Sequence, residues 1–374
     1  MRVGIDARFF GSVGKGLGRY TAELIRNLER VAPDGDEFVV FLRKENFNEY
    51  DPVNPRFTKV LADYPWYSFR EQIRFPLLLL RYRFDLVHFP HFNVPILYCR
   101  PFVVTIHDLI LLRYPTVRNT TKSRLTYRVK FLAYRIAIGS AVRRARRILT
   151  VSRFTEKDII SEYPKAVGKI FVAYEGCDML VAGTDDVGHA DDGNGSYHGI
   201  LEPYFLYVGN AYPHKNLEAF IPLAKRFPGI RFVLVGKEDH FYRRFRTAVE
   251  HAGVDNIVFA GFVPDGGLAQ LYRNATGYVF PSLYEGFGLP PLEAMRFGIP
   301  VVAAKRGSIP EILGDAALYF DPDHEEDLFR QVGRILAEPE LVSELRRKGT
   351  EQASLYHWEE LAKSSLLTYH EAVE

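Results

Sequence analysis

The stretch Gly277–Met295 reads GYVFPSLYEGFGLPPLEAM and joins three structural signals. Its first residues form an apolar, β-prone run that predicts a buried strand. Gly286 and Gly288 follow, and glycines there permit a tight turn and close approach of the backbone to a ligand. The prolines Pro290 and Pro291 then suit the first position of a helix. The order strand, glycine turn, helix predicts one βα unit of a parallel sheet.

The same alternation recurs through both halves of the chain. Further strands are predicted at VVTI (103–106), FLYVG (205–209), RFVLVG (231–236) and NIVFAG (256–261), with helical patterns at 215–226 and 240–252. Residues 181–199 are rich in Gly and Asp and lack periodicity, as a linker does. We therefore predict an α/β protein with two Rossmann-like, doubly wound parallel-sheet domains: 1–180, a linker at 181–201, and 202–357.

Composition narrows the class of protein. A chain of 374 residues favours two domains, and a net charge of +2 gives no argument for nucleic acid. Cys99 and Cys177 lie far apart without metal-type spacing, which favours a reducing, cytoplasmic location. Charges at Arg2, Asp6 and Arg8 argue against a signal peptide, and no apolar run is long enough to span a bilayer.

The glycine turn also predicts a binding site. The amides of Phe287, Gly288 and Leu289 would point out of a helix N-terminus, where phosphate binds. Glu285 and Glu293 flank this turn, eight positions apart. Carboxylates repel phosphate but accept hydroxyl hydrogen bonds, so the pattern predicts a ligand with a central diphosphate and a sugar at each end. The alternative is an acidic helix start that merely favours the helix dipole.

At this point the sequence shows a family resemblance. The pair Glu285-x7-Glu293 within EGFGLPPLEAM resembles the signature of the retaining glycosyltransferases of family 4, which have the GT-B fold. Eight other stretches occur in the family's order: GSVGKGLGRYTAEL (11–24), DLVHFP (85–90), VVTIHDL (103–109), TVSRFT (150–155), YVGNAYPHKN (207–216), VFAGFV (258–263), GSIPEILGDAALYFDP (307–322) and YHWEELA (356–362). The resemblance implies hexose transfer from a nucleotide-diphosphate sugar in a cleft between two domains. It also implies no metal or cofactor, and a last helix, 358–374, that returns to the first domain.

The resemblance assigns roles to several residues. Lys215, in the turn of VGNAYPHKN, would neutralise the departing diphosphate. The family usually places an arginine directly after the strand's glycine, but here Asn210 follows Gly209. The second cation is therefore missing or supplied by another residue, and three are considered: Lys15, Arg19 and His214.

The remaining donor residues follow from the same comparison. Glu293 would accept the ribose hydroxyls and Glu285 would orient a hexose hydroxyl, while Val263 would lie near the base. Together with Lys215, Asn210 and Gly286–Leu289, these residues form the predicted donor site.

Two motifs in the first half complete the predicted site. Gly16, within GKGLGR (14–19) and before a helix expected near Tyr20, would offer a backbone N–H to a phosphate or acceptor; the alternative is an ordinary turn. His107 directly follows the predicted strand at 103–106. Polar residues at the carboxyl end of a parallel strand face the ligand crevice. The resemblance places His107 beside the donor sugar; the alternative is a histidine that caps the next segment.

A basic segment suggests where the acceptor binds. Residues 113–147 contain eleven Arg and Lys and no Asp or Glu. Leu125, Val129, Leu132 and Ile136 form one helical stripe, beside a second stripe of Arg124, Arg128 and Arg135. Such a helix can lie on an anionic membrane, and residues 64–84 are a second candidate. The alternative is a core-facing helix with an ordinary solvated basic face. The membrane interpretation implies a lipid-linked saccharide acceptor.

Substrate identity stays open at the level of sequence. The motifs most resemble mannosyltransferases and favour GDP-mannose as the donor, with UDP-glucose and dTDP-rhamnose as alternatives. Two rival classes are a GT-B sugar-nucleotide epimerase, which needs acid and base carboxylates in the first half, and a non-catalytic sugar- or membrane-binding module, which Asn210 favours. A peripheral position at the inner face of the cell membrane follows only if the acceptor is a lipid.

Overall fold

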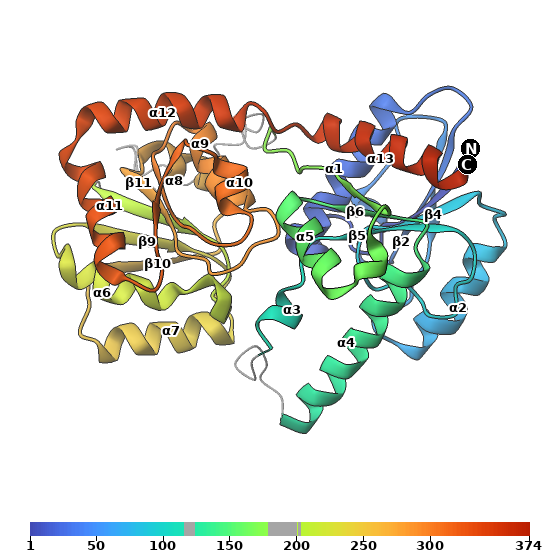
Figure 1. Ribbon diagram of the computed structural model, residues 1–374, viewed down its shortest axis with the longest axis horizontal. Helices are drawn as coiled ribbons and strands as arrows, with labels where there is room; N and C mark the ends of the chain where they lie inside the picture. The colour runs from blue at the N-terminus through green and yellow to red at the C-terminus, as the bar shows by residue number, and fades with distance from the viewer. Residues whose placement is uncertain (116–123, 179–199, 201–202) are drawn as a thin grey trace. The chain divides into compact units, whose positions relative to one another are not determined.

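The computed structural model describes residues 1–115, 124–178, 200 and 203–374, with the backbone alone for Lys15 and 124–126 (Figure 1). The chain divides into two compact units. The first unit contains residues 1–115, 124–176 and 357–374, and the second contains the described residues from 177 to 356. Apart from Ile200, the predicted linker at 181–201 lies outside the described residues.

The first unit is built on a seven-stranded sheet in the order β3-β2-β1-β4-β5-β6-β7, with every pairing parallel. Its strands are β1 (Arg2–Asp6), β2 (Glu37–Leu42), β3 (Phe57–Leu61), β4 (Leu86–Phe89), β5 (Phe102–Ile106), β6 (Arg147–Thr150) and β7 (Ile170–Val172). Its helices are η1 (Gly11–Gly14), α1 (Lys15–Val31), η2 (Phe47–Glu49), α2 (Phe69–Leu80), α3 (Ile110–Arg113), α4 (Arg124–Arg144), α5 (Arg153–Glu162), η4 (Pro164–Ala166) and α13 (Trp358–Val373).

The second unit repeats this arrangement with six parallel strands in the order β10-β9-β8-β11-β12-β13. These strands are β8 (Tyr204–Val208), β9 (Arg231–Val235), β10 (Ile257–Gly261), β11 (Gly277–Phe280), β12 (Val301–Ala304) and β13 (Ala317–Phe320). The helices are η5 (Pro213–Lys215), η6 (Leu217–Ala219), α6 (Phe220–Arg226), α7 (His240–His251), α8 (Asp265–Asn274), α9 (Leu289–Arg296), α10 (Ile309–Leu313), α11 (Glu325–Ala337) and α12 (Pro339–Ala353).

The strand order reverses direction once in each sheet, between β1 and β4 and between β8 and β11. In open parallel sheets, ligands bind outside the carboxyl ends of the strands at such a switch point. The loops that follow β8 and β11 carry Lys215 and Glu285, and the loop after β5, next to β4, carries His107. The fold therefore brings predicted site residues to the ligand-binding edge of each sheet.

Helices cover both faces of the first sheet. One core cluster contains Phe75 and Leu79 of α2 together with Tyr134 and Ile138 of α4, so these two helices cover the same face. The last helix, α13, begins at Trp358 as predicted and packs against α1. Its Tyr369 hydroxyl lies 2.7 Å from Nδ1 of His88 in β4. The final residues of the chain are thereby fixed to the first unit.

The first helix begins earlier than expected. The prediction placed its start near Tyr20, but α1 starts at Lys15, so Gly16 and Gly18 lie in its first turn. A Cβ on Gly18 would lie 2.0 Å from the carbonyl oxygen of Gly11, which leaves no room for a side chain. This close backbone contact requires glycine there, and the helix tolerates its low helix propensity. Within the described ranges, no helix is long and apolar enough to cross a membrane.

Candidate active site

An ion pair marks the carboxyl edge of the second sheet. Nζ of Lys215 lies 2.6 Å from Oε1 of Glu285, although the two residues are 70 positions apart in sequence. The side chains are 15% and 10% exposed, so the pair is largely shielded from water. A charge-assisted hydrogen bond of this kind fixes both groups in place. The structure thus brings together the two residues that the sequence assigned to the diphosphate and the hexose.

The backbone around Glu285 is held by the loop before α10. Oγ of Ser308 lies 3.0 Å from the carbonyl oxygen of Glu285 and 2.8 Å from that of Phe287. Gly307 has a φ of +62°, and a Cβ there would approach the Glu285 amide nitrogen to 3.0 Å. The GSIP sequence at 307–310 therefore fixes the glycine turn from outside, a contact that the sequence did not reveal.

Helix α9 has an unusual N-terminus. Gly288 precedes it with a φ of +104°, and a Cβ there would lie 2.5 Å from Cδ1 of Ile309. Leu289 is the first helical residue, one position earlier than the prolines were predicted to allow, so Pro290 and Pro291 occupy the second and third positions. Prolines lack an N–H. The four residues at this helix N-terminus are Gly288 to Pro291, and of these Gly288 and Leu289 have a backbone N–H. Two N–H groups instead of four can therefore donate to an anion here.

Two buried polar atoms beside the ion pair have no hydrogen-bond partner: Nδ1 of His214 and Oγ of Ser282. The backbone N–H of Leu283 donates to the carbonyl oxygen of His214 at 2.7 Å, which holds these segments together. His214 is 7% exposed and Ser282 is fully buried. Buried polar atoms are nearly always paired, so two unpaired atoms at a strand edge indicate a place for a polar ligand.

Asn210 occupies the position after Gly209, where the family usually has an arginine, so this position supplies no positive charge. The Asn210 side chain instead accepts a hydrogen bond from the backbone N–H of Tyr212 at 3.2 Å, which orders the loop. Burial, followed by the neighbouring charge of Lys215, lowers the pKa of His214 to about 4, so this ring is neutral at pH 7. Of the other two candidates, Arg19 belongs to the first unit, and the Lys15 side chain lies outside the described residues.

The second glutamate lies on α9, deeper in the unit. Glu293 is 4% exposed, and Oε2 lies 3.3 Å from the Tyr272 hydroxyl. Burial raises the pKa of Tyr278 well above its usual value, and the nearby charges of Glu293 and Glu285 contribute to this rise. Both glutamates therefore lie close enough to Tyr278 to affect its pKa. The Tyr278 hydroxyl accepts a hydrogen bond from the backbone N–H of Val208 at 3.1 Å.

In the first unit, three neighbours fix the ring of His107. Nε2 lies 2.9 Å from the carbonyl oxygen of Pro90, and because a carbonyl only accepts, Nε2 carries a proton. Nδ1 lies 3.5 Å from Oε1 of Glu175, and the Tyr20 ring meets the imidazole edge-on at 4.5 Å. Sequence reasoning missed Glu175. Its place shortly after the short strand β7 was the signal that could have identified it.

A second histidine lies behind this site. His88 is fully buried, and its two ring nitrogens lie 2.7 Å from the Tyr369 hydroxyl and 2.8 Å from Oγ1 of Thr105. The Tyr20 hydroxyl lies 3.3 Å from the same Thr105 oxygen. Burial, and then the charge of His107, lowers the pKa of His88 to about 3, which keeps this ring neutral. The network links α13 to the tyrosine that contacts His107.

Arg8, a fully buried arginine just after β1, forms structural ion pairs. Arg8 donates two hydrogen bonds to Asp6 and one to Glu71, each at 2.7 Å, and its guanidinium lies 4.0 Å from the Phe75 ring centre. Burial raises the pKa of Glu71, while the charge of Arg8 opposes this rise. Because both carboxylates already neutralise it, Arg8 is poorly placed to supply the second positive charge.

The remaining predicted residues lie apart from these contacts. Gly16 is exposed, and no atom would lie within 4 Å of an added Cβ, so its position requires no glycine on steric grounds. Val263 is buried next to the exposed Phe262 after β10. In the described part of the chain, no group of three His, Cys, Asp or Glu is arranged to hold a metal ion.

Helix α4 does not direct its predicted apolar stripe into the core. Val129, Leu132 and Ile136 are exposed, whereas Tyr134 and Ile138 are buried. The core-facing interpretation of the stripe is therefore wrong for these three residues. The side chains of Leu125 and Arg124, also part of the predicted stripes, lie outside the described residues.

Comparisons with known proteins agree with this architecture. A family model described as Glycosyltransferase Family 4 matches residues 14–179, and one described as Glycosyl transferases group 1 matches residues 200–352. The O-antigen chain mannosyltransferase B of Escherichia coli is 28% identical over 380 residues, which cover 95% of each chain.

Solved structures share the fold at low sequence identity. Sucrose-phosphate synthase from Thermosynechococcus elongatus gives a TM-score of 0.77 at 21% identity and covers 99% of this chain and 98% of its own. Anabaena HepE, solved in complex with UDP and glucose, gives 0.71 at 18% identity and covers 98% of both chains.

Two doubly wound parallel sheets, together with the family matches in both halves of the chain, identify a glycosyltransferase with the GT-B fold. The two family matches, which together span nearly the whole chain, give the more specific assignment. The chain belongs to family 4 of the glycosyltransferases.

Proposed function

We propose that this enzyme transfers mannose from GDP-mannose, with retention of anomeric configuration, to a saccharide acceptor linked to a lipid. The observation that carries the proposal is the Lys215–Glu285 pair at 2.6 Å, beside two buried polar atoms without partners. The mannosyltransferase activity named for the Escherichia coli relative supports the choice of sugar. Its place in O-antigen synthesis supports a surface-polysaccharide acceptor.

The donor is held by the second unit. Lys215 and the amides of Gly288 and Leu289 neutralise the diphosphate, and Glu293 accepts the ribose hydroxyls. Glu285 orients a hydroxyl of the mannose. Because negative charge grows on the departing diphosphate, prearranged donors at that position lower the barrier most. Diphosphate binding draws Lys215 away from Glu285, which frees the carboxylate for the sugar.

The reaction forms a bond between the acceptor oxygen and the anomeric carbon and breaks the bond from that carbon to the β-phosphate oxygen. The acceptor proton passes to the departing phosphate oxygen, and GDP leaves. His107 contacts the sugar and acceptor through its ring, which Pro90 and Glu175 hold in place. No metal or cofactor enters this scheme.

A lipid-linked acceptor requires a membrane-facing element, and we assign this role to the basic segment 113–147. Val129, Leu132 and Ile136 are 62%, 59% and 53% exposed on α4, with Arg128 and Arg135 beside them. Exposed apolar side chains interspersed with arginines suit the interface of an anionic bilayer.

A nucleotide-sugar panel tests the donor. Thermal unfolding is measured with GDP, GDP-mannose, UDP, UDP-glucose and dTDP-rhamnose, and UDP compounds are included because HepE was solved with UDP. We expect GDP and GDP-mannose to raise Tm most. A ligand at one hundred times its Kd adds about 2.7 kcal/mol to the unfolding free energy.

Product analysis with the best binder then separates the rival classes. A new glycosidic bond on an added acceptor supports transfer, whereas an epimerised sugar in the absence of acceptor identifies an epimerase. Stabilisation without any turnover would favour the non-catalytic module. Preference for UDP over GDP would overturn the choice of donor but leave the transferase class intact.

A further inference from the structure

Both ring nitrogens of His107 are engaged by the protein itself. Nε2 donates to the carbonyl oxygen of Pro90 at 2.9 Å, and Nδ1 lies 3.5 Å from Oε1 of Glu175. The backbone carbonyl of His107 is also engaged, because the Thr155 hydroxyl donates to it at 3.3 Å. The imidazole can therefore present its face and its charge to a ligand, but it has no ring nitrogen left for a hydrogen bond to a sugar hydroxyl.

The geometry also places a proton between His107 and Glu175. Because Nε2 already carries a hydrogen, a neutral imidazole would turn the lone pair of Nδ1 toward the carboxylate oxygen. Two such acceptors repel each other, whereas a hydrogen on Nδ1 makes the contact a pair of opposite charges. The side chains are 19% and 13% exposed, so water screens the pair only in part. The structure therefore favours an imidazolium beside a carboxylate.

The other titratable groups around His107 do not compete for this proton. Burial, and then the charge of His107, lowers the pKa of both His88 and His91 to about 3, so these rings are neutral at pH 7. Burial raises the pKa of Tyr20, whose ring meets the imidazole edge-on as a neutral phenol. The carboxylate of Asp108, the next residue in sequence, accepts a backbone N–H at the start of α3 at 2.9 Å.

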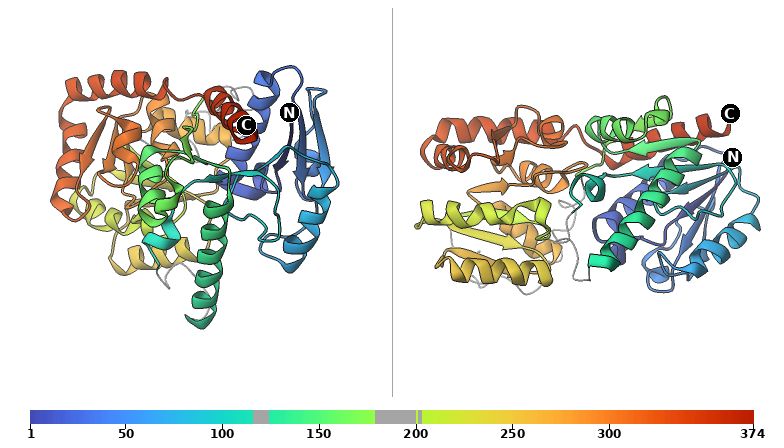
Figure 2. Two further views of the ribbon diagram at one scale, coloured as in Figure 1. Left: turned by 45° about the vertical axis from the view of Figure 1, so that its right-hand side comes forward. Right: turned by 60° about the horizontal axis from the view of Figure 1, so that its bottom comes forward.

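The backbone around Glu175 is fixed from both sides. The N–H of Ala173 donates to the carbonyl oxygen of Thr150 at 2.8 Å, which extends the pairing of β6 and β7 toward the site. On the other side, a Cβ on Gly176 would lie 2.2 Å from the backbone nitrogen of Trp358, the first residue of α13. Helix α13, whose end is marked C in Figure 2, packs in turn against α1. The carboxylate is therefore held by rigid elements, as a preorganised ligand-binding group requires.

The Glu175 carboxylate also has unused capacity to accept hydrogen bonds. A carboxylate offers two oxygens with about four acceptor positions. The contact with His107 uses Oε1, and no hydrogen bond joins Oε2 to another residue in the described part of the chain. Sugar hydroxyls are donors that an ionised carboxylate binds well. Glu175 can therefore supply the hydrogen bond to a sugar that the His107 ring cannot.

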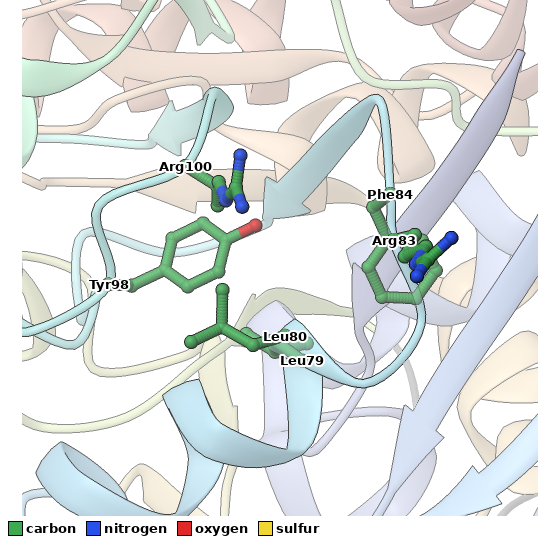
Figure 3. Close-up of a pocket in the computed structure, with 6 residues that line it drawn as sticks. All are labelled: Leu79, Leu80, Arg83, Phe84, Tyr98 and Arg100. Carbon is green, nitrogen blue, oxygen red and sulfur yellow. The ribbon is translucent and has the colours of Figure 1, made fainter.

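The pocket drawn in Figure 3 lies at the opposite edge of this sheet. It has a volume of about 300 Å³, and the residues that line it precede β4 and β5: Leu79, Leu80, Arg83, Phe84, Tyr98 and Arg100. Ligands of open parallel sheets bind instead outside the carboxyl ends of the strands. His107 follows β5 and Glu175 follows β7, so both lie at that ligand-binding edge.

We propose that Glu175 binds the acceptor saccharide. Its carboxylate accepts a hydrogen bond from the hydroxyl next to the one that attacks, and the imidazolium of His107 keeps that carboxylate ionised and in position. The inference rests on the proposed transfer to a saccharide, and it adds the class of acceptor, a sugar with two neighbouring hydroxyls. The attacking hydroxyl still gives its proton to the departing phosphate oxygen, so no proton moves to Glu175.

Nitrogen NMR of ring-labelled histidine tests the pair without any substrate. At pH 7 both ring nitrogens of His107 should resonate as protonated nitrogens, and His107→Asn identifies these signals by their loss. In Glu175→Gln the ring should become neutral with its hydrogen on Nε2, because the Pro90 carbonyl still requires a donor. A neutral His107 ring in the parent protein would overturn the proposal.

Two reactions of the donor then separate an acceptor contact from a structural role. GDP-mannose is incubated in water alone, and again with the methyl glycosides of mannose, glucose, galactose and N-acetylglucosamine. For the fastest of these acceptors, Glu175→Gln should lower kcat/KM about tenfold, mainly through KM, because the hydroxyl loses a charged partner. Hydrolysis of the donor should keep the parent rate, because water carries no neighbouring hydroxyl.

A deoxy acceptor and a matched variant locate the contact. The glycoside that lacks the hydroxyl beside the attacking one should react about tenfold more slowly with the parent and show no further loss with Glu175→Gln. Glu371→Gln is the control, because it neutralises an exposed carboxylate of the same unit that lies 3.7 Å from Nε of Arg147. It should match the parent in both reactions and in the His107 signals.

Two kinetic outcomes would also overturn the proposal. Equal losses of hydrolysis and transfer in Glu175→Gln would show that the residue supports the active site without touching the acceptor. Losses from the deoxy acceptor and from the variant that simply multiply would show that the two groups do not meet. Failure of the parent to consume any nucleotide-sugar would refute the proposed function, and with it the acceptor contact, while the NMR signals would still report the His107–Glu175 pair.

Discussion

The first six strands of the first unit follow the order β3-β2-β1-β4-β5-β6, with β7 added at the edge, and the second unit repeats that six-strand order as β10-β9-β8-β11-β12-β13. Their surfaces differ despite this shared topology. Of nineteen large apolar side chains that are exposed in the described residues, three belong to the second unit: Phe262, Leu336 and Leu355. The other sixteen lie on the first unit, and residues of α2 and α4 are among them.

The ligand-binding edges differ as well. The second unit places a buried ion pair, Lys215–Glu285, at its edge, with a glycine turn fixed by Ser308. The first unit places His107 there, backed by the neutral, buried His88. One scaffold therefore supports two kinds of chemistry: fixed charges that suit a diphosphate, and a held imidazole that suits a sugar and its acceptor. This division of roles makes separable predictions for each unit.

The largest expected effect is on turnover, from the second unit. Glu285→Gln should reduce kcat about a thousandfold, roughly 4 kcal/mol, because the sugar loses its charged hydrogen-bond acceptor in the transition state. GDP should bind no more weakly, since Lys215 is released from its 2.6 Å partner and becomes free for the diphosphate. Initial rates and isothermal titration measure the two quantities.

Glu250→Gln is the matched control for this change, because Glu250 is an exposed carboxylate of α7 in the same unit. It should leave both quantities at the parent value. Equal losses in turnover and GDP affinity for Glu285→Gln would contradict the assigned role of Glu285.

Acid should destabilise each unit through a buried, neutral histidine. The pKa of His88 falls to about 3 and that of His214 to about 4, mainly by burial. The unfolded chain takes up these protons near pH 6.5, so between that pH and the folded pKa values the unfolded state binds more protons. Stability is therefore complete above pH 6.5 and falls as the pH drops. At pH 5 the loss is about 2 kcal/mol for each histidine.

Unfolding free energies at pH 7 and pH 5 test this expectation, with GDP added to identify the transition of the second unit. His214→Gln should flatten the pH dependence of that transition and leave the first unit's transition unchanged. A pH dependence that survives in this variant would show that other groups in the second unit carry it.

The third effect is on nucleotide affinity. Glu293→Gln should weaken GDP binding about tenfold, roughly 1.5 kcal/mol, because a charged acceptor for the ribose hydroxyls becomes neutral. His107→Asn, the counterpart in the first unit, should lower turnover and leave GDP affinity unchanged. Titration calorimetry measures the GDP affinity of both variants. A loss of GDP affinity in His107→Asn would contradict the proposed division of roles between the two units.

The sequence predicted these elements where local pattern determines structure. Strands such as β5 and β9 are buried on both faces, so an unbroken apolar run identifies them without knowledge of their neighbours. The start of α1 was predicted five residues too late, because glycines usually interrupt helices, whereas here the helix includes two, and Gly18 is required by its close approach to the Gly11 carbonyl oxygen.

Contacts between distant segments could not be read in this way. The sequence named Lys215 and Glu285 as separate site residues, but their ion pair depends on how the loops after β8 and β11 meet. Glu175 and Ser308 were missed for the same reason, since each acts on a residue far away in the chain. Tertiary packing decides such pairs, and no periodicity records it.

The smallest expected effect concerns the loop that fixes the glycine turn. Ser308→Ala removes the hydroxyl that contacts the carbonyl oxygens of Glu285 and Phe287, at 3.0 and 2.8 Å. The transition that GDP shifts should lose about 1 kcal/mol, the value of one buried hydrogen bond, while the first unit's transition stays constant. Ser343→Ala is the matched control, because its hydroxyl bonds the Pro339 carbonyl at 3.0 Å on an exposed helix surface. Equal losses in the two serine variants would mean that the fixed turn contributes no more than an ordinary surface contact.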